Sequence, residues 1–245
     1  MKGIVSLSGG RDSSTLLAKV VKELGNENVI AISFDYGSKH PEELECAKKI
    51  VKYFGVKEHI IIKIDPSIFN GSSSTLLQGR KDVEKGKTYN EIIEENGKGS
   101  VDTYVPARNY LFSAYACAIA ESKADEYNDK VTYYLGQHAD DAAGEAYPDC
   151  SPAFVETMKK ATEISSQNRV TTESPFVHLH KEDIIQLALQ LGVPLNLTLS
   201  CYQPQTIVEE GKKYIVECGE CATCLDVKKA VEANNQTYSP TKIQI

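Results

Sequence analysis

Short apolar runs alternate with longer amphipathic stretches through the first 195 residues of the chain. The apolar runs are rich in Val, Ile and Phe and predict strands, while apolar residues at helical spacing predict helices. The predicted strands are 3–7, 28–35, 58–65, 131–135 and 170–176. The predicted helices are 15–24, 41–54, a long helix opened by 105–109 that runs through 120, one that begins near Pro152, and 181–191. Strands that alternate with single helices imply right-handed crossovers and a parallel sheet.

Five such strands fit an α/β fold with a doubly wound parallel sheet in the order 3-2-1-4-5. In these sheets, ligands bind at the carboxyl ends of the strands, where the strand order reverses. Polar clusters follow three of the predicted strands, at 8–14, 35–40 and 136–141. We therefore expect one ligand-binding cleft, within a first domain that spans 1–195.

The regular pattern is interrupted between 66 and 100. Pro66 ends the third strand because proline has no N–H to donate to a sheet, and the segment that follows holds Gly-Ser-Ser-Ser and scattered charge. We interpret 66–100 as a mobile surface insertion with one short helix near 89–95. Irregular segments of this length are usually functional lids or disordered, and a plain insertion is the alternative.

The composition, with 41% hydrophobic and 25% charged residues, is that of an ordinary soluble globular protein. The formal net charge of −7 argues against stable nucleic-acid binding, which selects basic surfaces. No apolar stretch approaches the length of a membrane span, and the N-terminus has no signal-peptide pattern. We therefore expect a cytoplasmic protein, in which the seven cysteines are metal ligands, catalytic thiols or core residues before they are disulfides.

The first polar cluster, Ser8-Gly9-Gly10-Arg11-Asp12-Ser13-Ser14, joins the first strand to the N-terminus of a helix. The glycines allow several N–H groups to turn toward one anion, and the helix start adds unpaired N–H groups and partial positive charge. Serine hydroxyls supply further donors. We expect a phosphate-binding loop, and the alternative is a Gly-Ser turn that caps the helix. Arg11 is interpreted either as an added phosphate contact or as a solvent-facing side chain.

Three cysteines lie within seven residues, at Cys218, Cys221 and Cys224, and Cys201 precedes them by seventeen positions. Four thiolates this close are typical of a tetrahedral structural zinc site, which would stabilise a C-terminal region, 196–245, that is too short to build its own core. An iron–sulfur cluster and redox disulfides are the two alternatives. A last helix is predicted at 225–233.

The loop at 8–14 resembles the SGGxDS motif of the ATP-pyrophosphatase (N-type) superfamily, whose members adenylate a substrate and release pyrophosphate. Nearly the full chain resembles the 7-cyano-7-deazaguanine synthase family of queuosine and archaeosine biosynthesis. The stretches that carry this resemblance are 8–13, 36–40 with Glu43, 105–109, Gly136, 147–150, Pro175 with His178 and Leu179, 191–194, 200–202 and 218–224.

The resemblance implies a fold like that of the adenine nucleotide alpha hydrolases, a zinc-bearing C-terminal tail and often a homodimer. It implies a ligase that forms C–N bonds: ATP adenylates the carboxylate of 7-carboxy-7-deazaguanine, and ammonia displaces AMP to give the amide. A second ATP activates the amide oxygen, and loss of AMP leaves the nitrile. Magnesium is expected to share the charge of the phosphates.

Residue roles follow from this resemblance as hypotheses. Asp12, Ser13 and Arg108 are expected to be catalytic, with the Arg108 guanidinium holding the substrate carboxylate. The expected ATP-binding residues are Ser8, Gly9, Gly10, Arg11, Asp12, Ser13, Ser14, Lys39 and His40; the substrate-binding residues are Arg108, Asn109, His138, Asp140 and Asp149; and the metal ligands are Cys201, Cys218, Cys221 and Cys224. The alternatives are a solvated lysine for Lys39, a helix cap for His40, a surface arginine for Arg108, a turn aspartate for Asp149, and a polar loop for 138–141.

The chain departs from the family pattern at Arg11, Ala107 and Asp226, and the segment 203–217 between the first two cysteines is long. These departures leave open a divergent member that passes the same acyl-adenylate to another amine, even a protein N-terminus. A transfer RNA thiolase of the same superfamily and a non-catalytic ATP-sensing module are two further candidate functions. The acidic charge of the chain counts against the thiolase.

Overall fold

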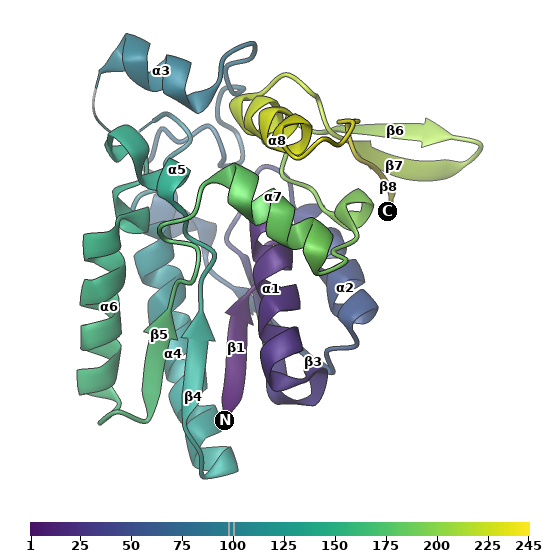
Figure 1. The fold of residues 1–245 in the computed structure, drawn as a ribbon. Coiled ribbons are helices and arrows are strands. Elements are labelled where there is room, and N and C mark those ends of the chain that lie inside the picture. Colours follow the sequence, from purple (N-terminus) through teal and green to yellow (C-terminus); the bar gives the residue numbers. More distant parts are fainter. Residues whose placement is uncertain (98, 100) are drawn as a thin grey trace.

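The computed structural model describes residues 1–97, 99 and 101–245, and within them the strands form one parallel and one antiparallel sheet (Figure 1). The parallel sheet has five strands in the order β3-β2-β1-β4-β5, which confirms the predicted doubly wound α/β fold. The strands are β1 (Lys2–Ser6), β2 (Val29–Asp35), β3 (Glu58–Lys63), β4 (Val131–Tyr134), β5 (Val170–Glu173), β6 (Gln205–Glu209), β7 (Lys212–Val216) and β8 (Lys242–Gln244). The helices are α1 (Arg11–Leu24), α2 (Glu43–Phe54), α3 (Tyr89–Asn96), α4 (Arg108–Tyr127), α5 (Ala139–Ala142), α6 (Pro152–Ser165), α7 (Lys181–Gln190) and α8 (Ala222–Ala233).

The central strand β1 shows why this sheet needs helices on both faces. Its successive side chains point to opposite faces of the sheet, so Ile4 and Val5, both fully buried, enter different cores. Ile4 belongs to the core that includes Ala116 of α4, whereas Val5 belongs to the core that includes Leu16 of α1. The sheet therefore lies between α4 on one face and α1 on the other. The carboxyl ends of its strands point toward the side of the molecule where α3 and α8 lie (Figure 1).

The C-terminal region contains a sheet that the sequence patterns did not predict. Strands β6 and β7 form a hairpin whose turn residues, Glu210 and Gly211, both have positive φ angles, of 49° and 76°. Two such residues match the right-handed twist of the flanking strands. Strand β8 completes this sheet from the end of the chain, and α8 packs on α7 through Val227, Ala230 and Ile185. The predicted last helix is confirmed and begins three residues earlier, at Ala222.

The insertion at 66–100 crosses between the strand ends and the C-terminal region. Its predicted short helix is confirmed as α3, which begins with a reciprocal capping box between Thr88 and Glu91. Isolated bridges pair Ser38 with Leu77, and Lys85 with Cys221, so the insertion contacts both regions. Residues 98 and 100 of the predicted insertion lie outside the described part, and its mobility stays a prediction.

Helices long and apolar enough to cross a membrane are absent from residues 1–97, 99 and 101–245.

Candidate active site

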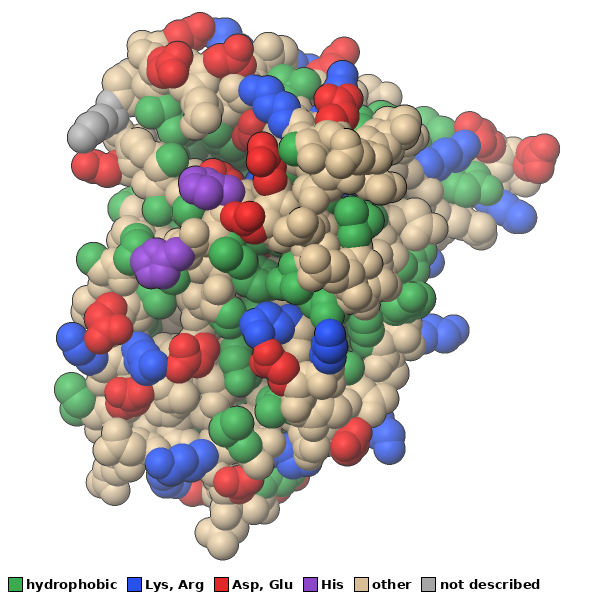
Figure 2. Space-filling model, in the orientation of Figure 1, with side chains coloured by type: hydrophobic (Ala, Val, Ile, Leu, Met, Phe, Trp, Pro, Cys, Tyr) green, Lys and Arg blue, Asp and Glu red, His purple; other side chains and the backbone are tan. Residues whose placement is uncertain are grey.

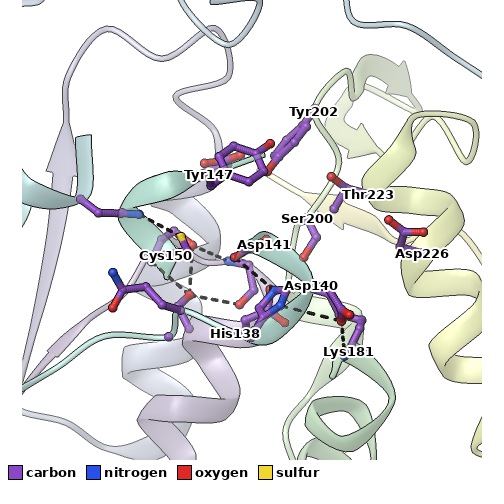
Figure 3. A pocket seen from close by; sticks show the side chains of 18 of the residues that line it. His138, Asp140, Asp141, Tyr147, Cys150, Lys181, Ser200, Tyr202, Thr223 and Asp226 are labelled. Carbon is purple, nitrogen blue, oxygen red and sulfur yellow. Dashed lines mark hydrogen bonds and ion pairs between the residues drawn. The ribbon is translucent and has the colours of Figure 1, made fainter. Parts of the chain in front are cut away.

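A cavity of about 560 Å³ lies at the carboxyl ends of β1, β2 and β4 (Figure 3). All three predicted polar clusters contribute to its lining, which confirms the prediction of one cleft. Those residues are Ser8, Gly10, Asp12 and Ser13; Tyr36, Ser38, Lys39 and His40; and Gly136, Gln137, His138, Asp140 and Asp141. The far wall comes from the C-terminal region, where Tyr202, Thr223 and Asp226 line the cavity. Charged side chains of both signs are interspersed over the face seen in Figure 2.

The loop after β1 is held in shape by its own serines. The Ser13 hydroxyl lies 3.0 Å from that of Ser8 and accepts the Ser8 N–H, while the Ser8 hydroxyl accepts the Gly10 N–H. Gly9 has φ +91°, and a Cβ there would lie 2.3 Å from the Glu43 carbonyl oxygen of α2. The loop is therefore pressed against α2 at Gly9, with Ser8 and Gly10 at the cavity.

Two loop residues point away from the cavity. The Ser14 hydroxyl is fully buried, with no hydrogen-bond partner among the described residues. Arg11 is only 3% exposed, which corrects its interpretation as solvent-facing. Its guanidinium donates to both carboxylate oxygens of Glu217, at 2.7 and 2.9 Å, and to the Thr241 hydroxyl at 2.8 Å. The Arg11 side chain therefore binds the C-terminal region, and Arg11 is not among the residues that line the cavity.

Asp12 meets a lysine that the sequence motifs did not single out. The Lys181 ammonium lies 2.7 Å from Asp12 Oδ2 and 3.0 Å from His138 Nε2. Burial alone would raise the pKa of Asp12, but the charge of Lys181 and the hydrogen bond to His138 outweigh it and hold that pKa well below its ordinary value. Burial likewise opposes protonation of Lys181, yet Asp12 and Asp141 raise its pKa overall. The cavity thus holds a partly buried ion pair beside the loop.

A sequence signal for Lys181 did exist. It is the first residue of α7, where the helix dipole disfavours a cation. A lysine in that place indicates a neighbouring anion. Asp140 fixes this helix start, because its carboxylate accepts the Lys181 N–H at 2.7 Å and lies 2.7 Å from His180 Nδ1. Asp140 therefore positions Lys181, in addition to lining the cavity.

Arg108, the first residue of α4, lines the cavity beside an aromatic wall. Its guanidinium donates to the Tyr36 hydroxyl at 3.2 Å, and the Phe112 ring stacks on Phe34 with centroids 4.0 Å apart. Glu43 lines the same part of the cavity, and burial raises its pKa to about 8 although Arg108 acts in the opposite direction. Burial therefore favours the protonated form of Glu43, which does not neutralise the Arg108 charge.

Asp149 is not among the residues that line the cavity, and its expected substrate contact stays a prediction. Its carboxylate accepts the backbone N–H of Asn109 at 3.0 Å, and the residue is only 6% exposed. Asp149 thus stabilises the start of α4, because an anion is favoured at a helix N-terminus. This structural role resembles the alternative interpretation of Asp149 as a turn aspartate. Asn109 itself lines the cavity, and its amide donates to Cys150 Sγ at 3.3 Å.

Lys39 and His40 both line the cavity after β2. The Lys39 ammonium is held by the insertion, 2.5 Å from Asp82 Oδ1 and 3.2 Å from the Lys81 carbonyl oxygen. His40 Nε2 is buried with no partner in the described part of the chain, and burial lowers the pKa of this imidazole. His40 therefore presents a neutral ring to the cavity.

The four predicted metal ligands converge. Ligand atoms of Cys201, Cys218, Cys221 and Cys224 all lie within 4.8 Å of one another. Backbone N–H groups point at two of the sulfurs: that of Cys218 donates to Cys201 Sγ at 3.2 Å, and that of Cys221 donates to Cys218 Sγ at 3.3 Å. Such bonds stabilise thiolates, so these residues fit a cation that takes four sulfur ligands. The cluster can bind a metal.

Fold and site together define an α/β protein with a doubly wound parallel sheet, a loop-lined cavity at the carboxyl ends of its strands and a C-terminal region that carries a cysteine cluster. The chain belongs to the family described as "Queuosine biosynthesis protein QueC", whose model matches residues 2–235.

Several relatives carry the name 7-cyano-7-deazaguanine synthase, and two of them illustrate the similarity. The protein from Desulfatibacillum aliphaticivorans is 36% identical over 247 residues, covering 98% of this chain and 96% of its own. The protein from Acetivibrio thermocellus is 38% identical over 229 residues, covering 91% of this chain and 90% of its own. Among solved structures, the U34-tRNA thiolase NcsA from Methanococcus maripaludis matches with a TM-score of 0.44 at 19% identity, over 79% of this chain and 57% of that one.

Proposed function

We propose that this chain is a C–N ligase that uses ATP and ammonia to convert 7-carboxy-7-deazaguanine into 7-cyano-7-deazaguanine. One observation carries the proposal: in a member of this family, a single cavity is lined by both the Ser8–Ser13 loop and the Arg108 guanidinium. A phosphate-binding loop and a carboxylate-binding cation facing one space are what adenylation of a carboxylate requires.

ATP would bind with its phosphates at the loop. The Ser8 and Ser13 hydroxyls and the N-terminus of the 14-residue helix α1 supply donors for anionic oxygens. Lys181 supplies a partly buried cation at the cavity, paired with Asp12, that would stabilise the charge of the leaving pyrophosphate. Lys39 and His40 line the adjoining wall, where the rest of the nucleotide would lie.

The substrate carboxylate would bind Arg108, with the planar ring against the Tyr36 and Phe112 side chains. In the first adenylation, a carboxylate oxygen attacks the α-phosphorus and pyrophosphate leaves. Ammonia then forms a C–N bond at the acyl carbon, and AMP leaves with that oxygen. We assign acceptance of the proton released by ammonia to Asp141, which lines the cavity 3.3 Å from His138.

The second adenylation uses the same arrangement, since the amide oxygen again attacks an α-phosphorus. Loss of AMP and of the remaining nitrogen-bound protons then leaves the carbon–nitrogen triple bond. Both carboxylate oxygens therefore depart on AMP, one on each molecule, and the cycle consumes two ATP per nitrile.

The test uses 7-carboxy-7-deazaguanine with both carboxylate oxygens labelled by ¹⁸O, plus ATP, magnesium and ammonia. Mass spectrometry should show nitrile together with two AMP per nitrile, each carrying one ¹⁸O. Asp12→Ala should abolish pyrophosphate release. Full nitrile formation by Asp12→Ala would remove the loop from the mechanism, and absence of labelled AMP in the wild type would refute the reaction itself.

Zinc at the four cysteines and magnesium at the phosphates belong to this proposal. The all-sulfur donor set fits zinc, and magnesium supplies charge neutralisation for the phosphates when bound. Metal analysis and the absorption spectrum of freshly purified protein test the first point. One iron–sulfur cluster per chain, together with a brown colour, would overturn the assignment of zinc to the four cysteines.

The divergent-member alternative has one observation in its favour. Asp226, which departs from the family pattern, lines the cavity on α8 (Figure 3). Accumulated amide, or an acyl conjugate in place of nitrile, would support transfer to another amine. The thiolase alternative has less support, because it needs a reactive thiol. Cys150 lines the cavity, but burial raises its pKa well above the ordinary value.

Assembly and location also remain proposals. Following the family resemblance, we propose a homodimer that acts on small molecules in the cytoplasm, without stable nucleic-acid binding. Light scattering tests the mass in solution, and cell fractionation tests the location.

A further inference from the structure

The residues that immediately precede two of the four cysteines both contact the phosphate loop. Ser200 precedes Cys201, and Glu217 precedes Cys218. The Ser200 hydroxyl accepts the backbone N–H of Arg11 at 3.0 Å, while the Glu217 carboxylate binds the Arg11 guanidinium with both oxygens. Arg11 thus contacts two separate chain segments, each one residue from a predicted metal ligand.

The Glu217 carboxylate also ties these segments together. Besides the guanidinium, its Oε1 accepts the Ser200 N–H at 3.2 Å and its Oε2 accepts the Thr241 N–H at 3.0 Å. The Glu217 side chain is fully buried and that of Arg11 is 4% exposed. In such a site, solvent cannot replace a lost partner, so Arg11 and Glu217 hold each other in one geometry.

A shift of Arg11 would displace the neighbouring residues that line the cavity. Arg11 lies between Gly10 and Asp12, which both line the cavity, and it is the first residue of α1. Next to it, the Gly9 carbonyl oxygen accepts the Leu199 N–H at 2.9 Å. Hydrogen bonds therefore join the loop after β1 and the start of α1 to the two segments that carry Cys201 and Cys218.

We propose that Arg11 is a positioning residue that couples the four-cysteine cluster to the phosphate loop, so that metal binding and ATP binding strengthen each other. The inference rests on the proposed function only for ATP as the ligand of the loop and zinc as the ion of the cluster. Coupling between two sites is reciprocal: any factor by which zinc tightens ATP binding is the factor by which ATP tightens zinc binding.

The experiment follows zinc rather than activity. Zinc-loaded wild-type protein is mixed with a chromophoric chelator, with and without magnesium and an ATP analogue that has a methylene group between its α- and β-phosphates. Equilibrium titration then gives the zinc affinity in each state. We expect the analogue to raise that affinity by about 5- to 150-fold, the range typical of coupled sites.

The variants separate this coupling from general stability. Arg11→Met combined with Glu217→Met removes both charges together, so that no lone buried charge remains. This pair should bind zinc and fold, yet lose most of the nucleotide effect. Arg11→Lys, which keeps a charge but not the fork, should keep part of it. Lys242→Met is the matched control, because Lys242 pairs with Glu209 on the C-terminal sheet, and it should behave as wild type.

Each outcome decides something. Wild type that binds the analogue without any change in zinc affinity overturns the coupling and leaves the proposed function standing. Wild type that binds no analogue overturns both. A nucleotide effect of unchanged size in the Met pair overturns the role of Arg11. If that pair does not fold, the same comparison is decided by Arg11→Lys.

Discussion

The Lys181 ammonium lies 2.7 Å from the Asp12 carboxylate, and the two side chains come from positions 169 residues apart. Asp12 belongs to the loop after β1, whereas Lys181 begins α7 beyond the last strand of the parallel sheet. This pair places a cation at the floor of the cavity before any phosphate arrives. The ligand therefore meets a charge that is already in place, and little reorganisation is needed during the reaction.

The first prediction concerns this cation. Lys181→Met should lower kcat/KM for pyrophosphate release by on the order of 10²- to 10³-fold, as for loss of one preorganised group that stabilises developing charge. Lys159→Met is the control, because Lys159 pairs with Glu173 at 2.7 Å near the surface. Stopped assays of pyrophosphate release measure both variants. Wild-type kinetics in Lys181→Met would mean that this lysine only balances Asp12.

A second prediction concerns the carboxylate-binding group. Arg108→Lys keeps the charge but loses the planar fork, which costs ~1.5–3 kcal/mol for a hydrogen bond to a charged group. We expect kcat/KM for 7-carboxy-7-deazaguanine to fall roughly 10- to 100-fold, with ATP affinity unchanged. Arg169→Lys, at a surface ion pair with Glu121, serves as the matched control. An equal loss in ATP affinity would assign Arg108 to the nucleotide instead.

A third prediction follows from Glu43, whose pKa burial raises from 4.5 to about 8. Between these two values the folded protein holds a proton that the unfolded chain has released. The free energy of unfolding should therefore fall as the pH rises from about 5 to 8. In Glu43→Gln, this contribution to the slope should disappear, whereas the exposed control Glu45→Gln should keep it. Urea unfolding at several pH values measures the slope, and identical slopes in all three proteins would contradict the raised pKa.

A fourth prediction concerns the buried Arg11–Glu217 pair. Arg11→Met alone leaves the Glu217 carboxylate buried without its counter-charge, which should cost ~3–5 kcal/mol of unfolding free energy. Adding Glu217→Met should restore most of that loss, because an apolar pair of similar size needs no counter-charge. A double-mutant cycle by denaturant unfolding gives the interaction energy. If the two single losses simply add, the ion pair is not the stabilising contact.

Much of the fold follows from local patterns. All five parallel strands, their order and the helix at α3 are predicted, because each strand is a short apolar run and each helix has its own periodicity. The hairpin at β6 and β7 is not, although Thr206 to Val208 and Tyr214 to Val216 are β-prone on either side of Glu210-Gly211. Charged residues flank both short runs, so neither stands out as a strand. The sequence therefore indicates only a long connection between two metal ligands.

The site is harder to predict because side-chain direction depends on tertiary contacts. Arg11 and Asp12 are neighbours in one loop, yet one contacts the C-terminal region and the other faces the cavity. No local pattern distinguishes them. The sequence predicts the same role, substrate binding, for Asp149 and Asp140. In the structure, Asp140 lines the cavity, whereas Asp149 binds the start of α4. Lys181 belongs to no recognisable motif, and its one sequence signal is an unfavourable position on a helix.

The reach of Arg11 has a consequence for biosynthesis of the chain. Its partners Glu217 and Thr241 lie 206 and 230 positions further along, so they leave the ribosome well after Arg11 does. The first strand and helix can pair with later strands much earlier, since domains generally fold as they emerge. The phosphate loop, in contrast, acquires its final contacts only when the last strand is in place. A nascent chain that has not yet reached Thr241 would therefore hold the parallel sheet while Arg11 still lacks its final partners.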